Sequence, residues 1–527
     1  MARELKKRFN ITGTCIPKKH YMADTSQKLR QIIQLIEQDS YFTINRARQY
    51  GKTTTLLLLW QKLKEKYIVI NISFEGMGID AFRSEDAFVR SFCGRVEKNL
   101  KLSGYENALQ TAWKCKETQE NLETLRDRII DFCTNEKEVL LFIDEVDKSS
   151  DNQMFLNFLG LLRELYLERA MGTVTFKSVI LSGVYDIKNL KLKLRPDEEQ
   201  KYNSPWNIAA DFRIDMSFSV PEILTMLEEY QNVQDFTFDT MSVAQEIFRY
   251  TSGYPFLVSL ICLWLDERLE CDLFKDCWTP WGVRTAVREI LKATNTLFDD
   301  MAKNLENNRV FRQFVEGLLF GGNQIPFKLS NPEINLGVTF GIISEEEGLC
   351  KISNIIFETY LYDYFVTDKA VNGLAISTPR TQFIKEDGCL DMDAVLDKFQ
   401  ELMKTEYRKE DEAFLEKQGR LLFLCFLKPI INGKGHYVVE PQTRNDTRMD
   451  IAIFYGREEF IVELKVWHGF QKHQEGLAQL LSYMESRNQK RGWLLTFCFL
   501  AGREKTIKDY TKIVTCADDR EIYSVVV

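Results

Sequence analysis

The chain has 527 residues, of which 45% are hydrophobic and 28% are charged, and its formal net charge is −8 at pH 7. This length predicts three or four domains, and the composition is that of a globular protein. The acidic balance argues against a surface coated with nucleic acid, and no run reaches the roughly twenty apolar residues that span a bilayer.

The termini and the cysteines indicate a cytoplasmic protein. The N-terminal segment Met1–Arg8 is basic, and it lacks the apolar run of a signal peptide. Twelve cysteines are scattered without the Cys-x-x-Cys spacing of zinc or redox sites, and several lie in apolar runs. We therefore expect reduced core residues and no disulfide bonds.

The first predicted site follows a strand-like run that ends at Asn45. An apolar helical run opens on Gly51-Lys52-Thr53-Thr54, which are the parts of a phosphate-binding loop. Backbone N–H groups at such a helix start face phosphates, Lys52 reaches the β/γ oxygens, and the Thr53 hydroxyl ligates Mg²⁺. The full motif has a glycine where this chain has Arg46, so the loop predicts ATP binding and leaves hydrolysis open, although arginines add positive charge toward phosphate. The candidate cofactor-binding residues in this loop are Arg46, Arg48, Gly51, Lys52, Thr53 and Thr54.

The run Glu138–Glu145 predicts a partner for this loop. It is a nearly all-apolar strand that ends in two acids, as in a central strand of a parallel sheet covered on both faces. Asp144 would bind Mg²⁺, and Glu145 would polarise the attacking water. Tyr67–Ile72 and Ser178–Val184 read as further buried strands.

Together with Thr251-Ser252-Gly253-Tyr254-Pro255, these motifs resemble the AAA-like P-loop ATPase family. The resemblance implies an α/β core with a parallel sheet over residues 1–218, a helical lid over 219–297 and ATP as cofactor. Two short strand-like runs, Gly337–Ile343 and Leu349–Asn354, favour the wing of a winged helix within 298–365. Residues 366–387 mix Gly, Ser, Thr, Pro and charge, so we expect a linker there.

The second predicted site lies near the C-terminus, in two β-like runs. Asp450 opens the first run, and the second contains Glu463-Leu464-Lys465. Residues two apart in a strand share a face, so Glu463 and Lys465 project together, and Asp450 meets them across a hairpin. Carboxylates bind Mg²⁺, and a nearby lysine can orient water or stabilise the charge of a pentacovalent transition state. The sequence therefore predicts a metal and phosphate site.

The neighbouring segments extend this pattern. The predicted order over residues 388–527 is helix, three strands, helix, strand, and it resembles the PD-(D/E)XK nuclease superfamily. The run Lys428–Gly435, the block Glu463–Gly469 and the block Gln479–Tyr483 resemble the nuclease module that many bacterial proteins fuse to AAA-like ATPase domains. The resemblance implies Asp450, Glu463 and Lys465 as catalytic residues, with Asp450 and Glu463 on the metal, and Gln479 as an accessory. Either Glu440 or Glu416 would supply an additional acid.

The combined interpretation is an ATP-binding, metal-dependent nuclease whose ATPase domain regulates assembly or access. The expected cofactors are ATP and Mg²⁺ or Mn²⁺, and the expected substrate is DNA rather than RNA. Homo-oligomerisation is compatible with this interpretation. The alternatives are an ATP-switched scaffold whose nuclease fold binds nucleic acid or a partner without cutting, and an ATP-driven remodeller of proteins.

Overall fold

The computed structural model describes residues 7–115, 117–146, 153–184, 206–269, 277–320, 325–371, 383–385, 387–406, 412–431, 434–440, 450–456, 458–467, 470–497, 513–515 and 520–527. The chain divides into two compact units, and each is described by itself below. The N-terminal unit holds Met1–Phe248, Gly253–Val283 and Val338–Gly341, and the C-terminal unit holds the remaining segments.

Four parallel strands form the sheet of the N-terminal unit. Their order is β1-β4-β3-β2, with β1 at Phe42–Asn45, β4 at Ser178–Gly183, β3 at Val139–Asp144 and β2 at Ile68–Ser73. Every residue of β3 and β4 is buried. The predicted parallel sheet is confirmed, and the apolar runs that predicted its strands are long because both faces are covered.

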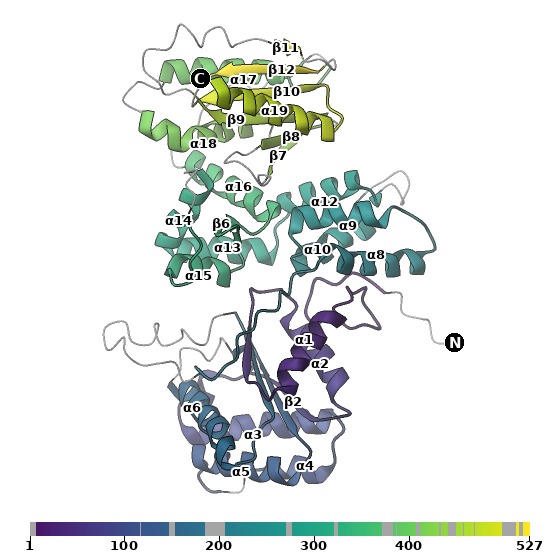
Figure 1. The fold of residues 1–527 in the computed structure, drawn as a ribbon, viewed down its shortest axis with the longest axis vertical. Helices are drawn as coiled ribbons and strands as arrows, with labels where there is room; N and C mark the ends of the chain where they lie inside the picture. The colour runs from purple at the N-terminus through teal and green to yellow at the C-terminus, as the bar shows by residue number, and fades with distance from the viewer. Residues whose placement is uncertain are drawn as a thin grey trace. The chain divides into compact units, whose positions relative to one another are not determined.

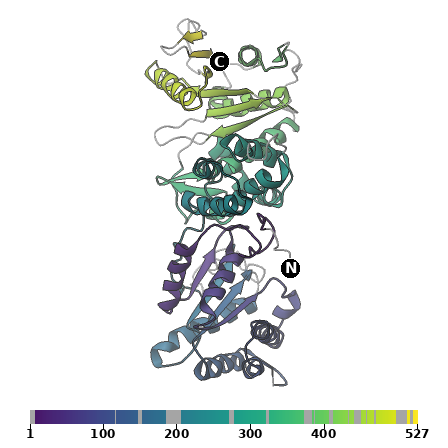
Figure 2. The same cartoon turned by 90° about the vertical axis from the view of Figure 1, so that its right-hand side faces the viewer.

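Helices cover the two faces of this sheet (Figure 1). On one face, α1 (Ser26–Glu37) and α2 (Lys52–Leu63) pack on a cluster that includes Leu140 and Phe142 of β3. Leu141 and Ile143 point to the other face, where the helices α3 (Glu85–Leu102), α5 (Leu122–Asn135) and α6 (Gln153–Glu168) cover them. Figure 2 shows the same layers from a second direction. The short α4 (Asn107–Ala112) follows α3, and the 3₁₀ turns are Ile79–Phe82 and Arg169–Met171.

The segment after the sheet is helical, as predicted. It contains α8 (Val220–Gln234), α9 (Thr240–Thr251), α10 (Pro255–Leu263), a π-helical turn at Trp264–Arg268 and α12 (Pro280–Lys292). A capping box starts α8, in which the Ser219 hydroxyl accepts from the Glu222 N–H and the Glu222 carboxylate accepts from the Ser219 N–H.

The chain continues with a helical group and a small hairpin, most of which belong to the C-terminal unit. The helices are α13 (Thr296–Asn307), α14 (Arg309–Phe320), α15 (Pro332–Thr339) and α16 (Ile355–Val371), and the hairpin pairs β5 (Ile343–Glu346) with β6 (Leu349–Ile352). The expected hairpin is therefore present, but its first strand begins at Ile343 because Gly337 belongs to α15. Helix α16 also extends into the segment expected as a linker, and residues 372–382 lie outside the description.

A six-stranded mixed sheet follows, in the order β11-β12-β10-β9-β8-β7. Its strands are β7 (Gly435–Glu440), β8 (Asp450–Tyr455), β9 (Glu458–Val466), β10 (Arg491–Phe497), β11 (Ile513–Thr515) and β12 (Glu521–Val526). The strands from β7 to β9 are antiparallel, whereas β10 runs parallel to β9 and β12. With α18 (Glu412–Ile431) and α19 (Phe470–Ser486), the predicted order of helix, three strands, helix and strand is present.

Different helices cover the two faces of this second sheet. Leu480 and Met484 of α19 pack on Ile461, Leu494 and Ile522. Helices α17 (Met392–Glu406) and α18 lie on the opposite face, where the Phe399 and Phe497 rings are in contact and Gly419 of α18 abuts Phe497. Side chains of α19 therefore meet one face of the sheet, and side chains of α17 and α18 meet the other face.

Two findings bear on the remaining expectations. Eight cysteines of the described residues carry free thiols, but Cys277 is disulfide-bonded, so the expectation of no disulfide bonds is wrong at this position. Sequence spacing misses it because disulfide formation requires two Cα atoms about 4–7 Å apart in space. Across the described part of the chain, every helix is too short or too polar to cross a membrane.

Gly253 joins α9 to α10 with a positive φ of 74°. An added Cβ would lie 1.9 Å from the carbonyl oxygen of Phe218, whose N–H donates to the Gly253 oxygen at 2.8 Å. We predict that Gly253→Ala lowers the free energy of unfolding of the N-terminal unit by about 3 kcal/mol or more. Gly172 also has a positive φ, of 95°, but nothing lies within 4 Å of its added Cβ. Gly172→Ala should therefore cost about 1 kcal/mol. Equal melting temperatures of the two variants would contradict the close approach at Gly253.

Candidate functional sites

The loop Arg46–Gly51 joins β1 to α2 and presents the start of that helix. Gly51 caps α2 in a left-handed conformation, with a φ of 77° that glycine adopts without steric cost. Lys52 is 7% exposed, and its ammonium donates to the carbonyl oxygens of Arg46 and Ala47 at 2.8 and 3.0 Å. The Lys52 side chain therefore reaches back to the first residues of the loop, and the N–H groups of the first turn of α2 lie beside it.

Asp144 lies at the end of β3 and accepts hydrogen bonds from α2, from β4 and from the residue that follows it. Its carboxylate accepts from the Thr53 hydroxyl at 2.5 Å, from the Ser182 hydroxyl at 2.7 Å and from the Glu145 N–H at 3.0 Å. The predicted pairing of the loop with the acidic strand end is thus present in space. Glu145 follows with a φ of 54°, an uncommon conformation for a residue with a side chain.

The two loop arginines have different surroundings. The Arg46 guanidinium donates to the carbonyl oxygens of Asn45 and Ile214 at 2.7 and 2.6 Å and lies over the Phe212 ring. Burial lowers the pKa of Arg46 below its ordinary value. Arg48 lines a cavity next to the loop, whereas Arg46 is absent from the cavity lining. The hydrogen bonds of Arg46 thus hold the start of the loop against the segment that contains Ile214.

This cavity has a volume of about 570 Å³, and several segments enclose it. The loop and the start of α2 form one side, with Glu75 and Glu145 nearby, and the helical segment contributes Phe218, Met226 and Phe256. Residues between Asn10 and Thr25 form a further wall, fixed by the Cys15 N–H, which donates to the Thr54 hydroxyl at 3.1 Å. Sequence motifs did not predict these N-terminal and helical residues, because they reach the loop from far along the chain.

Two tyrosines fix the outer side of the loop. The Tyr254 hydroxyl donates to the Arg48 carbonyl oxygen at 2.6 Å, and the Tyr50 and Tyr254 rings meet edge-to-face at 4.6 Å. Tyr50 also shares a hydrogen bond of 2.8 Å with the Ser217 hydroxyl. The element Thr251–Pro255, which the sequence assigned to the lid, therefore contacts the loop directly.

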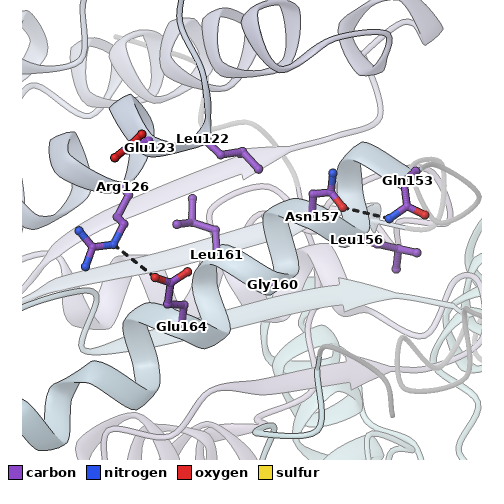
Figure 3. Close-up of a pocket in the computed structure, with 9 residues that line it drawn as sticks. All are labelled: Leu122, Glu123, Arg126, Gln153, Leu156, Asn157, Gly160, Leu161 and Glu164. Carbon is purple, nitrogen blue, oxygen red and sulfur yellow. Dashed lines mark hydrogen bonds and ion pairs between the residues drawn. The ribbon is translucent and has the colours of Figure 1, made fainter. Parts of the chain in front are cut away.

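A second hollow, of about 760 Å³, lies between α5 and α6 (Figure 3). Leu156 and Leu161 are nearly buried in its lining, Arg126 pairs with Glu164 at 3.8 Å, and Gln153 donates to Asn157 at 2.9 Å. None of the predicted site residues lines this hollow. The cavity at the loop is therefore the nucleotide-site candidate of the N-terminal unit.

In the C-terminal unit, Glu463 and Lys465 form a buried ion pair on β9. Their exposed fractions are 1% and 3%. The Lys465 ammonium also donates to the Gln479 amide oxygen at 2.5 Å, so α19 and β9 meet at this lysine. Gly476 leaves room for it, because a Cβ there would lie 2.7 Å from Lys465 Cε.

The strand register places the predicted acids in one row. Glu440 of β7 pairs with Asp450 of β8, and Asp450 pairs with Glu463 of β9. Residues directly opposite in neighbouring strands share a face, about 5 Å apart at Cβ. Glu416 belongs to α18, which packs on the opposite face.

The side chains of Glu416, Glu440 and Asp450 lie outside the description. Among the residues whose side chains are described, no three His, Cys, Asp or Glu side chains gather as a metal-binding group.

Comparison with known proteins agrees with the N-terminal geometry. Residues 17–272 match the model of a family described as an AAA-like domain. This part of the chain is an AAA-like P-loop domain. A comparison with curated proteins finds no match.

Among solved structures, the chain is similar to the Walker-type ATPase PABY2304 of Pyrococcus abyssi. The two are 13% identical with a TM-score of 0.46, over 67% of this chain and 99% of that chain. It is also similar to the Aeropyrum pernix ORC2 protein in its ADPNP–ADP complexes, at 12% identity and a TM-score of 0.36, over 69% and 98% of the chains. The Aeropyrum pernix ORC1 protein in complex with DNA gives 12% identity and a TM-score of 0.28, over 66% and 94%.

The buried pair on β9 predicts a specific pattern of stability. Lys465→Met leaves the Glu463 carboxylate buried without its cation, which should lower the free energy of unfolding by about 3–5 kcal/mol. Glu463→Gln should cost a similar amount because the ammonium then lacks its counter-charge. The double variant should regain most of the loss, and thermal or urea unfolding of all four proteins measures this coupling. Additive losses would show that the two charges do not depend on each other.

Proposed function

We propose that the AAA-like domain binds ATP with Mg²⁺ in the cavity at the loop Arg46–Gly51. The single observation that carries this proposal is the contact between Thr53 and the Asp144 carboxylate, which joins the helix start to the acidic strand end. A magnesium ion takes oxygen ligands, and the Thr53 hydroxyl and Asp144 supply them where the phosphates would lie.

The surrounding residues have distinct roles in this proposal. Lys52 would exchange its loop carbonyl partners for β/γ-phosphate oxygens, and Arg48 on the cavity wall would add positive charge. Ser182 orients the Asp144 carboxylate. Glu145, which lines the same cavity, would polarise the water that attacks the γ-phosphate.

We further propose that the C-terminal unit hydrolyses phosphodiester bonds, in DNA in preference to RNA. Support comes from the register of Glu440, Asp450 and Glu463 and from the buried pair of Glu463 with Lys465. A divalent ion bound by these carboxylates would polarise the scissile phosphate and acidify a water molecule. Lys465, held by Gln479, would orient the attacking water and stabilise charge at phosphorus.

The additional acid of this site is Glu440 in our proposal. Glu440 shares the sheet row of Asp450 and Glu463, whereas α18, which carries Glu416, packs on the opposite face. Glu440→Ala should therefore reduce cleavage, and Glu416→Ala should leave it close to the wild-type rate.

A second candidate function is an ATP-switched scaffold whose C-terminal unit binds nucleic acid or a partner without cutting. The observation that favours it is the tight closure around Glu463 and Lys465, which leaves both almost without solvent contact. The cleavage experiment below separates the two functions.

The nucleotide proposal predicts the effects of three substitutions. Lys52→Ala should weaken binding of a fluorescent ATP analogue at least about tenfold, because a charge-assisted phosphate contact is lost. Lys66→Ala is the matched control, since this exposed lysine pairs with Glu37 and lies outside the cavity lining. Glu145→Gln should keep binding and lose phosphate release. Equal binding by the Lys52 variant and the wild type would refute the site.

The nuclease proposal is tested with plasmid, linear and single-stranded DNA in Mg²⁺ or Mn²⁺, with and without ATP. Asp450→Ala and Glu463→Ala should each reduce cleavage at least roughly a hundredfold, as should a chelator. Glu458→Ala is the matched control, because it removes an exposed carboxylate from the same strand. Cleavage by Lys52→Ala that does not respond to ATP, where the wild type does, would show that nucleotide regulates access. Absence of cleavage on every DNA and on RNA would leave the scaffold function.

A further inference from the structure

Thr496 of β10 lies directly beside the proposed catalytic lysine. The parallel register pairs Thr496 with Lys465, and it pairs Leu494 with Glu463. Paired residues of neighbouring strands share a face, so Thr496 occupies the same covered face as the ion pair. Helix α19 packs over this face, with Leu480 against Leu494 and Gln479 on Lys465.

The Thr496 hydroxyl is buried without a hydrogen-bond partner. The residue is 1% exposed, and within the described part of the chain its Oγ1 contacts no donor or acceptor. Leaving a buried hydroxyl unpaired costs about 1–3 kcal/mol, whereas valine, of the same shape, would cost nothing. The Thr496 Oγ1 atom is therefore an unused acceptor on the strand next to Lys465.

Lys465 is the polar group nearest in the sheet register, and its ammonium has a short range of movement. Helix α19 passes close to the lysine side chain at Gly476, where an added Cβ would lie 2.7 Å from Lys465 Cε. Gln479 and Glu463 hold the nitrogen. If the Glu463 carboxylate were to bind a metal ion, the Lys465 ammonium would lose part of its anionic partner and would need another acceptor to remain oriented.

We propose that Thr496 is a positioning residue, which accepts a hydrogen bond from the Lys465 ammonium once Glu463 engages a metal ion. This inference rests on the proposed nuclease function for its purpose. The contact itself involves only residues of this chain, so it is testable apart from cleavage.

Ser524 of β12 provides a matched control. It is 2% exposed, its hydroxyl also lacks a partner among the described residues, and it lies on the same face. Its register partner is Leu494, so β10 separates Ser524 from the ion pair on β9. Any effect of losing a buried hydroxyl as such should appear at both positions, and an effect through Lys465 only at Thr496.

The test compares full-length wild type with Thr496→Val, Thr496→Ser and Ser524→Ala in Mn²⁺. The rate at which an amine-selective reagent modifies Lys465 is followed by mass spectrometry at one fixed pH. Loss of the acceptor leaves the Lys465 ammonium held by fewer hydrogen bonds, so Thr496→Val should raise the modification rate roughly threefold to tenfold. Thr496→Ser and Ser524→Ala should match the wild type. Melting temperatures establish that each variant is folded.

The outcomes separate this inference from the function it serves. If the wild type cleaves DNA, Thr496→Val should lower kcat with KM unchanged. If the wild type cleaves nothing, the proposed nuclease function fails, and the modification rates still decide the contact. Equal Lys465 modification in Thr496→Val and wild type, or an equal change in Ser524→Ala, overturns the inference.

Discussion

The burial of strand β3 is the constraint on which the N-terminal site depends. All six of its residues are buried, including the charged Asp144 at its end. A carboxylate in such a place is costly unless hydrogen bonds satisfy it. Thr53 from α2 and Ser182 from β4 meet that need, so the sheet, the helix start and the neighbouring strand are fixed to one another by a single side chain. The position of the loop Arg46–Gly51 therefore depends on the hydrogen bonds of Asp144.

The C-terminal unit also buries a carboxylate, and there a second charge of opposite sign stabilises it. Glu463 and Lys465 are buried by α19, and each is the counter-charge of the other. Breaking such a pair from one side is expensive, but replacing both partners by apolar residues often is not. Stability alone therefore gives no reason to keep two charges here. The proposed chemistry at a phosphate would give one, because it would use a carboxylate and an ammonium that lie on the same face of the sheet.

The sequence predicted the parts of this molecule whose signal is local. The apolar run before Asp144 predicted a central strand, and the spacing of Glu463 and Lys465 predicted a shared face. The resemblance implied only that Gln479 is an accessory residue of the site, and the structure shows that its amide oxygen accepts a hydrogen bond from Lys465. These predictions succeeded because burial on both faces and the two-residue period of a strand are visible in a few consecutive letters.

Contacts between distant segments could not be predicted in this way. Nothing in the residues around Cys15 or Tyr254 indicates that they reach the loop, because those contacts exist only once the sheet and the helical segment are packed. The position of Arg46 is a similar case. Its charge suggested phosphate, but the guanidinium lies on backbone carbonyls and the Phe212 ring. Thr496 carries no motif at all, and only the strand register places it beside Lys465.

The burial of Glu463 and Lys465 also has a consequence for ionic strength. In the proposed nuclease, the buried pair and the surface contacts to a phosphate backbone would respond differently to added salt. Mobile ions screen charges that water reaches, over about 10 Å at 0.1 M salt, and act far less on a buried pair. Contacts between surface cations and a phosphate backbone weaken steeply as salt rises, because counterions released on binding must be recaptured. For the proposed nuclease function, added salt would thus release a bound polynucleotide while the buried pair of Glu463 and Lys465 stays intact.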